Sequence, residues 1–167
     1  MIYPTRSSKG FSTATLICAI ALAGCGGDSA VASKREAISR LDALIQKGDE
    51  ASQFARQWRD IGDRAPDAIL QKMSDYYDAV LQDSHNVNYA ALDSAYPQLG
   101  TMLRDTLIKS YSLNAECIRE WMQARSAGAS LKITPDFYQK ATEAGRLEQE
   151  WANWFNSHFD DINKAIQ

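Results

Sequence analysis

Apolar residues recur at three- and four-residue steps through most of residues 34–167, and this period constrains the fold most strongly. Residues at that spacing share one face of an α-helix, whereas the apolar residues of a half-buried strand alternate every second position. Gly and Pro are common in the turns of folds made of strands, and here they number only nine and four in the 167 residues. The pattern therefore predicts an all-α fold of long helices.

Turn signals divide the periodic region into four amphipathic segments. The expected helices span residues 33–61, 66–92, 102–128 and 134–166. Ser33 to Glu36 has the spacing of a capping box at the start of the first helix, and Gly48 is a point where that helix could divide. Four such helices with short connections predict an antiparallel four-helix bundle. The polar stretch 83–88 leaves an irregular bundle with a broken second helix as the alternative.

The limits of the last two helices have the clearest signals. Gly128 is a typical residue just beyond a helix C-terminus, so it is the expected end of the third helix. Thr134 supplies a hydroxyl for an N-cap, and Pro135 suits the first helical position. Asp136 adds a negative charge at the positive end of the helix dipole. These residues predict the start of the fourth helix at 134–136.

The first 24 residues have the parts of an export signal. Arg6 and Lys9 give a positively charged start, and an uncharged, largely apolar run follows from Phe11 to Ala23. That run is shorter than the roughly 20 residues a helix needs to span a bilayer. Residues 1–24 are therefore predicted to be a cleaved signal peptide rather than a membrane-spanning helix.

The residues Leu22-Ala23-Gly24-Cys25 follow this run directly. They resemble the lipobox of bacterial lipoprotein precursors, in which a branched apolar residue and two small residues precede a cysteine. The resemblance covers residues 1–25 and implies cleavage before Cys25, with a diacylglycerol thioether and further acyl chains such as palmitate on that residue. Two or three buried acyl chains give stable membrane anchoring.

The resemblance divides the chain into three parts. Residues 1–24 are the signal peptide, residues 25–33 the lipidated cysteine with a small, polar tether, and residues 34–167 the helical bundle domain. In this family Asp directly after the cysteine favours retention in the inner membrane, and here that position is Gly26. The protein is thus expected in the cell envelope, and at the outer membrane, facing the periplasm or the surface, in a host with two membranes.

Charge and cysteine content limit the partners of the domain. The chain carries a net charge of −3, and loss of Arg6 and Lys9 with the signal peptide leaves −5. An acidic surface argues against nucleic acid, whose phosphates need a basic face. Cys117 is the single cysteine that remains beyond Cys25, so no disulfide is expected within the domain, and helical spacing predicts a buried thiol.

Motifs for catalysis or for metal and cofactor binding are missing from the sequence. His85 and His158 are far apart, and neither belongs to a Glu-x-x-His or His-Glu-x-x-His motif. A second cysteine for a zinc cluster, a Gly-x-Ser-x-Gly elbow and a glycine-rich phosphate loop are also absent. The expectation is a protein without catalytic activity, metal or cofactor, apart from the covalent lipid on Cys25.

Aromatic residues gather on the last helix, at Trp151, Trp154 and His158. Trp151 continues the apolar stripe of that helix, while Trp154 and His158 are displaced from its centre. A wide stripe of this kind is often buried between two neighbouring helices. Alternatively it is partly exposed and forms an interaction patch, since Trp and Tyr anchor many protein interfaces.

These observations favour a membrane-anchored lipoprotein whose helical domain binds another cell-envelope protein. Such a protein could be an immunity or inhibitor protein, or an accessory of an envelope-assembly complex. One alternative is a carrier that holds a small apolar ligand between its helices. Another is an enzyme of unfamiliar type, with polar groups that converge from different helices.

Overall fold

The computed structural model describes residues 29–59, 65–129 and 134–166. These residues form helices and short connections, with no strand among them, so the predicted all-α class is confirmed. The elements are α1 (Ser29–Arg59), α2 (Asp67–Ser84), α3 (Tyr89–Ala95), α4 (Leu99–Met102), the π-helical segment η2 (Leu103–Ile108), α5 (Lys109–Ser126) and α6 (Pro135–Ile166).

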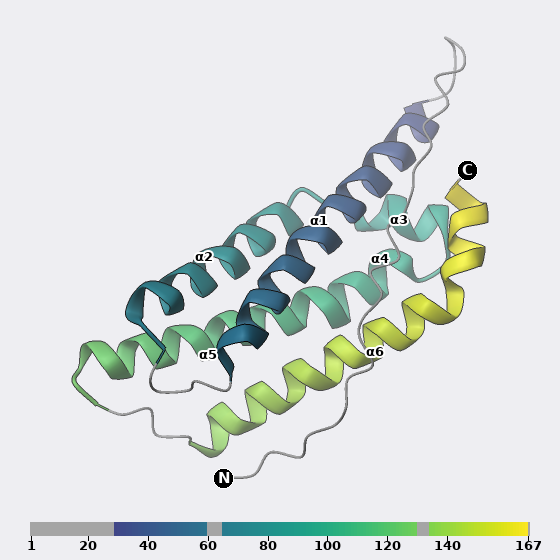
Figure 1. Cartoon of the computed structure of the whole chain (residues 1–167). Coiled ribbons are helices and arrows are strands. Elements are labelled where there is room, and N and C mark those ends of the chain that lie inside the picture. Colours follow the sequence, from purple (N-terminus) through teal and green to yellow (C-terminus); the bar gives the residue numbers. More distant parts are fainter. Residues whose placement is uncertain (1–28, 60–64, 130–133, 167) are drawn as a thin grey trace.

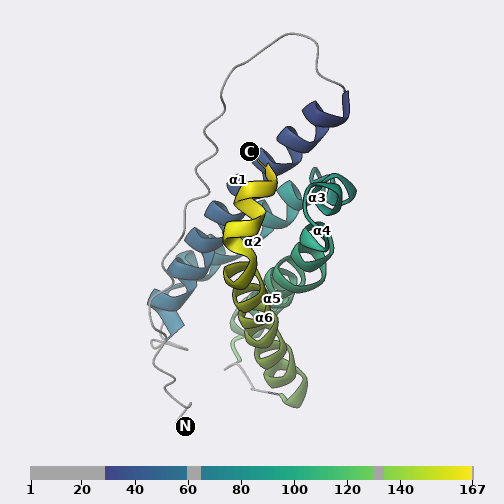
Figure 2. The ribbon, with the colours of Figure 1, turned by 90° about the vertical axis from the view of Figure 1, so that its right-hand side faces the viewer.

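The long helices alternate in direction along one axis (Figure 1). α1 and α2 form one antiparallel pair, and α4, η2 and α5 make a continuous rod that runs antiparallel to α6. α1 contacts α2 and α3, α2 contacts α5, and α6 contacts both α5 and η2. The predicted antiparallel helical bundle is therefore confirmed, and the view in Figure 2 shows the short α3 and α4 at one end of it.

Apolar side chains from every long helix meet in one core. Its largest fully buried members are Tyr111, Leu41, Leu44, Leu70, Leu92, Leu99, Leu103, Ile162 and Val80. Burial of a side chain of this size contributes about 1.5–3 kcal/mol relative to exposure, so the core supplies most of the driving force for packing.

The second expected helix is interrupted, as the alternative reading of the sequence allowed. α2 ends at Ser84, where the hydroxyl donates a hydrogen bond to the carbonyl of Leu81 at 2.6 Å. The chain restarts as α3 at Tyr89, with the side chain of Asn88 accepting a hydrogen bond from the backbone N–H of Ala91 at 3.0 Å. Asn is a favoured N-cap, so the polar stretch both ends one helix and starts the next.

The first helix differs from the sequence prediction at its start. α1 begins at Ser29, about one turn before the Ser33–Glu36 capping box that was expected to open it. Glu36 instead pairs with Arg40 one turn further on, at 2.7 Å. The residues Ser29-Ala-Val-Ala contain neither Gly nor Pro, so nothing prevents the helix from extending toward the N-terminus.

The third helix begins earlier than expected, at Leu99, and contains a π-helical turn. Its buried residues include Leu99, Leu103, Leu107, Tyr111 and Ala115, each four positions after the last. On a regular α-helix every four-residue step overshoots one turn by about 40°, so the stripe would drift by about 160°. A π turn takes up an extra residue and keeps this stripe on the core side.

The connection between the last two helices follows the predicted signals. Gly128 has φ +66°, and the backbone N–H groups of Gly128 and Ala129 donate to the carbonyls of Arg125 and Ala124. This is a Schellman motif, which satisfies carbonyls at the end of α5. The hydroxyl of Thr134 accepts a hydrogen bond from the N–H of Phe137 at 3.1 Å, which confirms the predicted N-cap of α6.

Among the residues that the structure describes, none of the helices has the length and apolar character needed to cross a membrane.

Candidate functional site

The three residues of the predicted patch, Trp151, Trp154 and His158, differ in how far they are buried. Trp151 is 6% exposed and stacks on the buried Phe155 with ring centroids 5.1 Å apart, so it belongs to the core. Trp154 and His158 lie beside the buried stripe of α6, and both are half-buried. The structure therefore leaves Trp154 and His158 at the surface and removes Trp151 from the accessible part of the patch.

A residue from outside α6 completes the surface group. Tyr96, in the turn between α3 and α4, meets Trp154 at a centroid distance of 6.2 Å and His158 at 6.0 Å, both edge-on. Trp154 and His158 stack on each other at 4.9 Å. We call Tyr96, Trp154 and His158 the aromatic patch. Each ring contacts the other two, so their orientations are fixed before any partner binds.

Hydrogen bonds fix the orientation of the imidazole. Nδ1 of His158 lies 2.8 Å from the carbonyl oxygen of Trp154 and 2.9 Å from the hydroxyl of Ser157. A carbonyl oxygen only accepts hydrogen bonds, so the neutral ring carries its hydrogen on Nδ1. Nε2 then keeps a lone pair that can accept a hydrogen bond from a partner.

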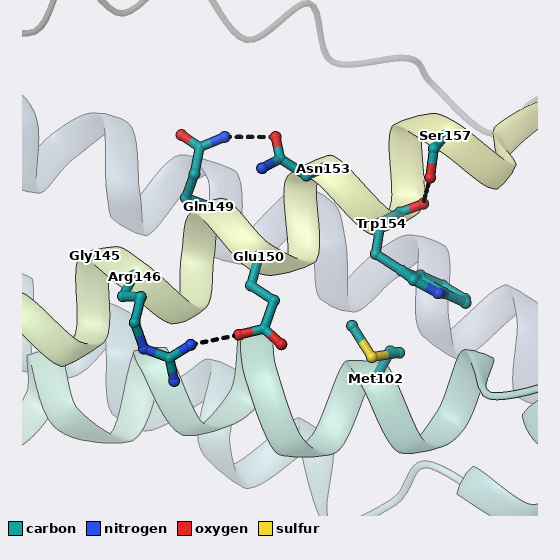
Figure 3. Close-up of a pocket in the computed structure, with 8 residues that line it drawn as sticks. All are labelled: Met102, Gly145, Arg146, Gln149, Glu150, Asn153, Trp154 and Ser157. Carbon is teal, nitrogen blue, oxygen red and sulfur yellow. Dashed lines mark hydrogen bonds and ion pairs between the residues drawn. The ribbon is translucent and has the colours of Figure 1, made fainter.

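An open groove of about 1000 Å³ adjoins the patch (Figure 3). Its floor and walls come from α6 and from the end of α4. The lining residues are Met102, Gly145, Arg146, Gln149, Glu150, Asn153, Trp154 and Ser157. Met102 and the Trp154 ring make the apolar end of the groove, and the remaining surface is mainly charged or amide-bearing.

The polar side of the groove is organised by bonds along α6. Arg146 pairs with Glu143 at 2.7 Å and with Glu150 at 2.6 Å, and its guanidinium lowers the pKa of the Glu143 carboxyl. The side-chain amide of Gln149 donates to that of Asn153 at 2.8 Å. These pairs join residues three or four positions apart, which share a face of the helix.

Asp93 in α3 fixes the segment that carries Tyr96 and Met102. Its carboxylate accepts hydrogen bonds from the N–H groups of Gly100 and Thr101 and from the Thr101 hydroxyl, at 2.8, 3.0 and 2.9 Å. It therefore caps the first turn of α4 from a different helix. The turn itself includes Gln98 in the left-handed conformation, at φ +67°. This clamp sets where the tyrosine and the methionine stand beside α6.

Cys117 lies away from the groove, and its predicted burial is confirmed. The side chain is 8% exposed, and burial raises the pKa of its thiol to about 11. Close by, Lys140 of α6 bonds Glu120 of α5 at 2.5 Å and Asp136 at 3.0 Å. This cluster joins the two helices. In the part of the chain that the structure describes, there is no group of three or more potential metal ligands.

The sequence pointed to Trp154 and His158 but missed Tyr96 and Met102. Tyr96 lies in a turn and Met102 on the expected third helix, and no pattern in the sequence links either residue to α6. The lipidation residue Cys25 and the rest of the lipobox lie outside the described residues.

Together, the fold and the site define a helical-bundle protein with an aromatic patch beside a polar groove on its last helix. No protein-family model, curated protein or solved structure matches the chain.

Proposed function

We propose that this protein is a lipoprotein, anchored in the cell envelope through Cys25, whose helical domain binds another envelope protein without catalysing a reaction. The lipobox at residues 22–25 supports the anchor. One structural observation carries the binding role: half-buried Tyr96, Trp154 and His158 form a mutually packed surface group beside an open groove.

The arrangement has the properties of a protein interface. Trp and Tyr provide large contact areas, and they lose little rotamer entropy on binding when their rings already pack on each other. Gln149, Asn153 and the Arg146–Glu150 pair supply hydrogen-bond donors and acceptors next to this apolar centre. An apolar anchor with a polar rim is the usual composition of such interfaces.

The nature of the groove favours a protein over an apolar cargo. Five of its eight lining residues carry charged, amide or hydroxyl groups, and these are Arg146, Gln149, Glu150, Asn153 and Ser157. Pockets for apolar ligands are lined predominantly by apolar side chains. The carrier function therefore stays the alternative, and native mass spectrometry that finds a bound small molecule at unit stoichiometry would support it. An immunity or inhibitor protein and an envelope-assembly accessory both fit the proposed binding role.

The anchor is tested by labelling cells with an alkyne fatty acid and measuring the intact mass of the purified protein. We expect label on the unaltered protein, a mass that corresponds to cleavage before residue 25, and loss of both after Cys25→Ser. Full label on the Cys25→Ser protein would contradict the proposed anchor.

The binding surface is tested by placing a photo-crosslinking amino acid at Asn153, in the groove. A defined partner adduct should form in intact cells and should fall at least tenfold with Trp154→Ala, because the apolar centre is lost. Tyr138 is a matched control, since it lies on the same helix, is 56% exposed and is outside the groove. Tyr138→Ala should leave the adduct unchanged. Equal adduct yield for the unaltered protein, Trp154→Ala and Tyr138→Ala would exclude the aromatic patch as the binding surface.

A further inference from the structure

One end of the bundle holds the start of α1. The first turns of α1 lie against the α2–α3 connection, where Glu36 and Arg40 share a small hollow with Asn86 and Asn88. Tyr96, just beyond α3, contacts the C-terminal half of α6 through His158. Both views show the start of α1, α3 and the end of α6 at the same end of the molecule (Figures 1 and 2). We call this the anchor-side end.

The opposite end, which we call the far end, is held by separate contacts. Arg125 at the end of α5 donates to the carbonyl of Ala65 and pairs with Asp67, at the start of α2, at 2.8 Å. Lys140 near the start of α6 pairs with Glu120 at 2.5 Å. The far end is therefore a rigid part of the same bundle, and its distance from the anchor-side end is fixed.

The chain between Cys25 and the bundle is short. Cys25 precedes Ser29 by four residues, which span at most about 14 Å when fully extended. α1 contains 31 residues and is therefore about 46 Å long. A lipid on Cys25 would therefore stay within about 14 Å of Ser29 and could not itself hold Arg59, at the other end of α1, at the bilayer.

The start of α1 also has a charge opposite to that of the domain. Lys34, Arg35 and Arg40 are countered there by Glu36, whose side chain is 65% exposed and pairs with Arg40. This leaves two net positive charges on residues 29–40, although Asp28 and Asp42 flank that stretch, on a mature chain of net charge −5. The α6 part of this end carries Asp160, Asp161 and Lys164, so the basic edge belongs to α1. Basic residues next to a lipid anchor are attracted to anionic headgroups.

We infer that the bundle stands upright on the bilayer, with the anchor-side end on the headgroups, the basic start of α1 against anionic lipid, and the far end pointing away. The inference rests on the proposed lipid anchor. In this orientation α6 and its groove run along the height of the molecule and face sideways. A partner of the groove would then approach along the membrane, as an envelope protein attached to the same surface does.

The test uses lipidated protein in vesicles that contain anionic lipid and an energy-transfer acceptor on the lipid headgroup. Single donor dyes are placed on α6 through Lys164→Cys or Gln139→Cys, with Cys117→Ala present so that one free thiol remains. Both labelled positions are exposed, and they lie 25 residues, about 38 Å, apart on one helix. We expect several-fold stronger transfer from position 164 than from position 139.

A second comparison tests the basic edge. The paired changes Lys34→Glu and Arg35→Glu should reduce the difference in energy transfer between positions 164 and 139 on anionic vesicles. On neutral vesicles they should leave that difference unchanged. Lys109→Glu, an exposed change in the middle of the bundle, is the control and should have no effect.

The outcomes separate this inference from the proposed anchor. Equal transfer from both positions on vesicles that bind all of the protein would show that the bundle lies flat, and stronger transfer from position 139 would show that it is inverted. Either result overturns the upright orientation while the anchor stands. Protein that carries no lipid and does not float with vesicles would overturn the anchor itself.

Discussion

Gly48 of α1 and Tyr111 of α5 are in such close contact that a Cβ atom on Gly48 would lie 2.1 Å from the Tyr111 hydroxyl oxygen. Tyr111 is 2% exposed and also packs on Tyr77, with ring centroids 5.9 Å apart. The missing side chain of Gly48 thus makes room for the phenol between the helices. α1 continues through Gly48 instead of dividing there, and the glycine permits this close approach of Tyr111.

Gly48→Ala should destabilise the protein by about 1–3 kcal/mol, because the new methyl group displaces a fully enclosed ring. Gly145→Ala is the matched control on α6, since its Cβ would meet nothing within 4 Å. It should stabilise the protein by roughly 0.5–1 kcal/mol, the usual gain from Gly to Ala within a helix. Urea unfolding followed by circular dichroism measures both. Equal effects of the same sign would contradict the packing described here.

Asp93→Ala should cost about 1–3 kcal/mol, because the N–H groups of Gly100 and Thr101 lose their acceptor at the start of α4. Hydrogen exchange of these two amides should accelerate more than that of amides in the middle of α5. The control is Asp75→Ala, which removes an exposed side chain that accepts a hydrogen bond from the exposed Gln71 and should change stability by less than about 0.5 kcal/mol. Unchanged exchange at residues 100 and 101 would count against the clamp.

Deletion of Asp105 should convert the π turn to regular α-helix and leave the protein folded, within about 1 kcal/mol of the original stability. The deletion brings the buried residues that follow it one position closer, which restores three- and four-residue spacing across the former π turn. Deletion of Arg119, also exposed but in regular helix, should cost about 2–5 kcal/mol, since it turns Trp121 and Met122 away from their neighbours. Thermal unfolding distinguishes the two deletions, and equal losses would refute this account of the π turn.

Cys117 should react slowly with thiol reagents near neutral pH until the protein unfolds. Burial raises the pKa of its thiol from 9.0 to about 11, so the reactive thiolate is scarce in the folded state. Between about pH 9 and 11 the unfolded chain loses this proton first, so the contribution of the neutral thiol to stability is present below pH 9 and lost as the pH rises toward 11.

This pH effect is measured by urea unfolding of a chain that starts at residue 25 and carries Cys25→Ser. Its stability should fall more steeply above pH 9 than that of the same chain with Cys117→Ala, which lacks the titrating group. Parallel pH profiles, or rapid labelling of the folded chain, would show that the thiol is accessible.

Features encoded by neighbouring residues could be predicted from the sequence. The Thr134 cap and the Gly128 stop depend on residues within one turn of themselves, and both formed as expected. Leu103, Leu107 and Tyr111 also stand at four-residue steps in the sequence, but the extension of that stripe to Leu99 and Ala115, and the π turn that accommodates it, depend on which side of the helix is buried.

Features that depend on distant residues could not be predicted. The apolar stripe of the last helix placed Trp151 nearer its centre than Trp154, but how far each ring is buried depends on the position of the neighbouring elements. Tyr96 joins Trp154 across 58 residues of sequence, through a turn that Asp93 holds in place. No local pattern encodes such a contact, so the patch could be predicted only in part.

The order of helix contacts has a consequence for how the chain reaches its native state. α1 packs on α2, and α5 packs on α6, so much of the core joins segments that are adjacent along the chain. Helical proteins with such local contacts fold within microseconds to milliseconds, because little loop entropy is lost before contacts form. Each helical hairpin can therefore assemble from its own two helices, whereas the Tyr111–Gly48 contact also requires α5 to dock on α1.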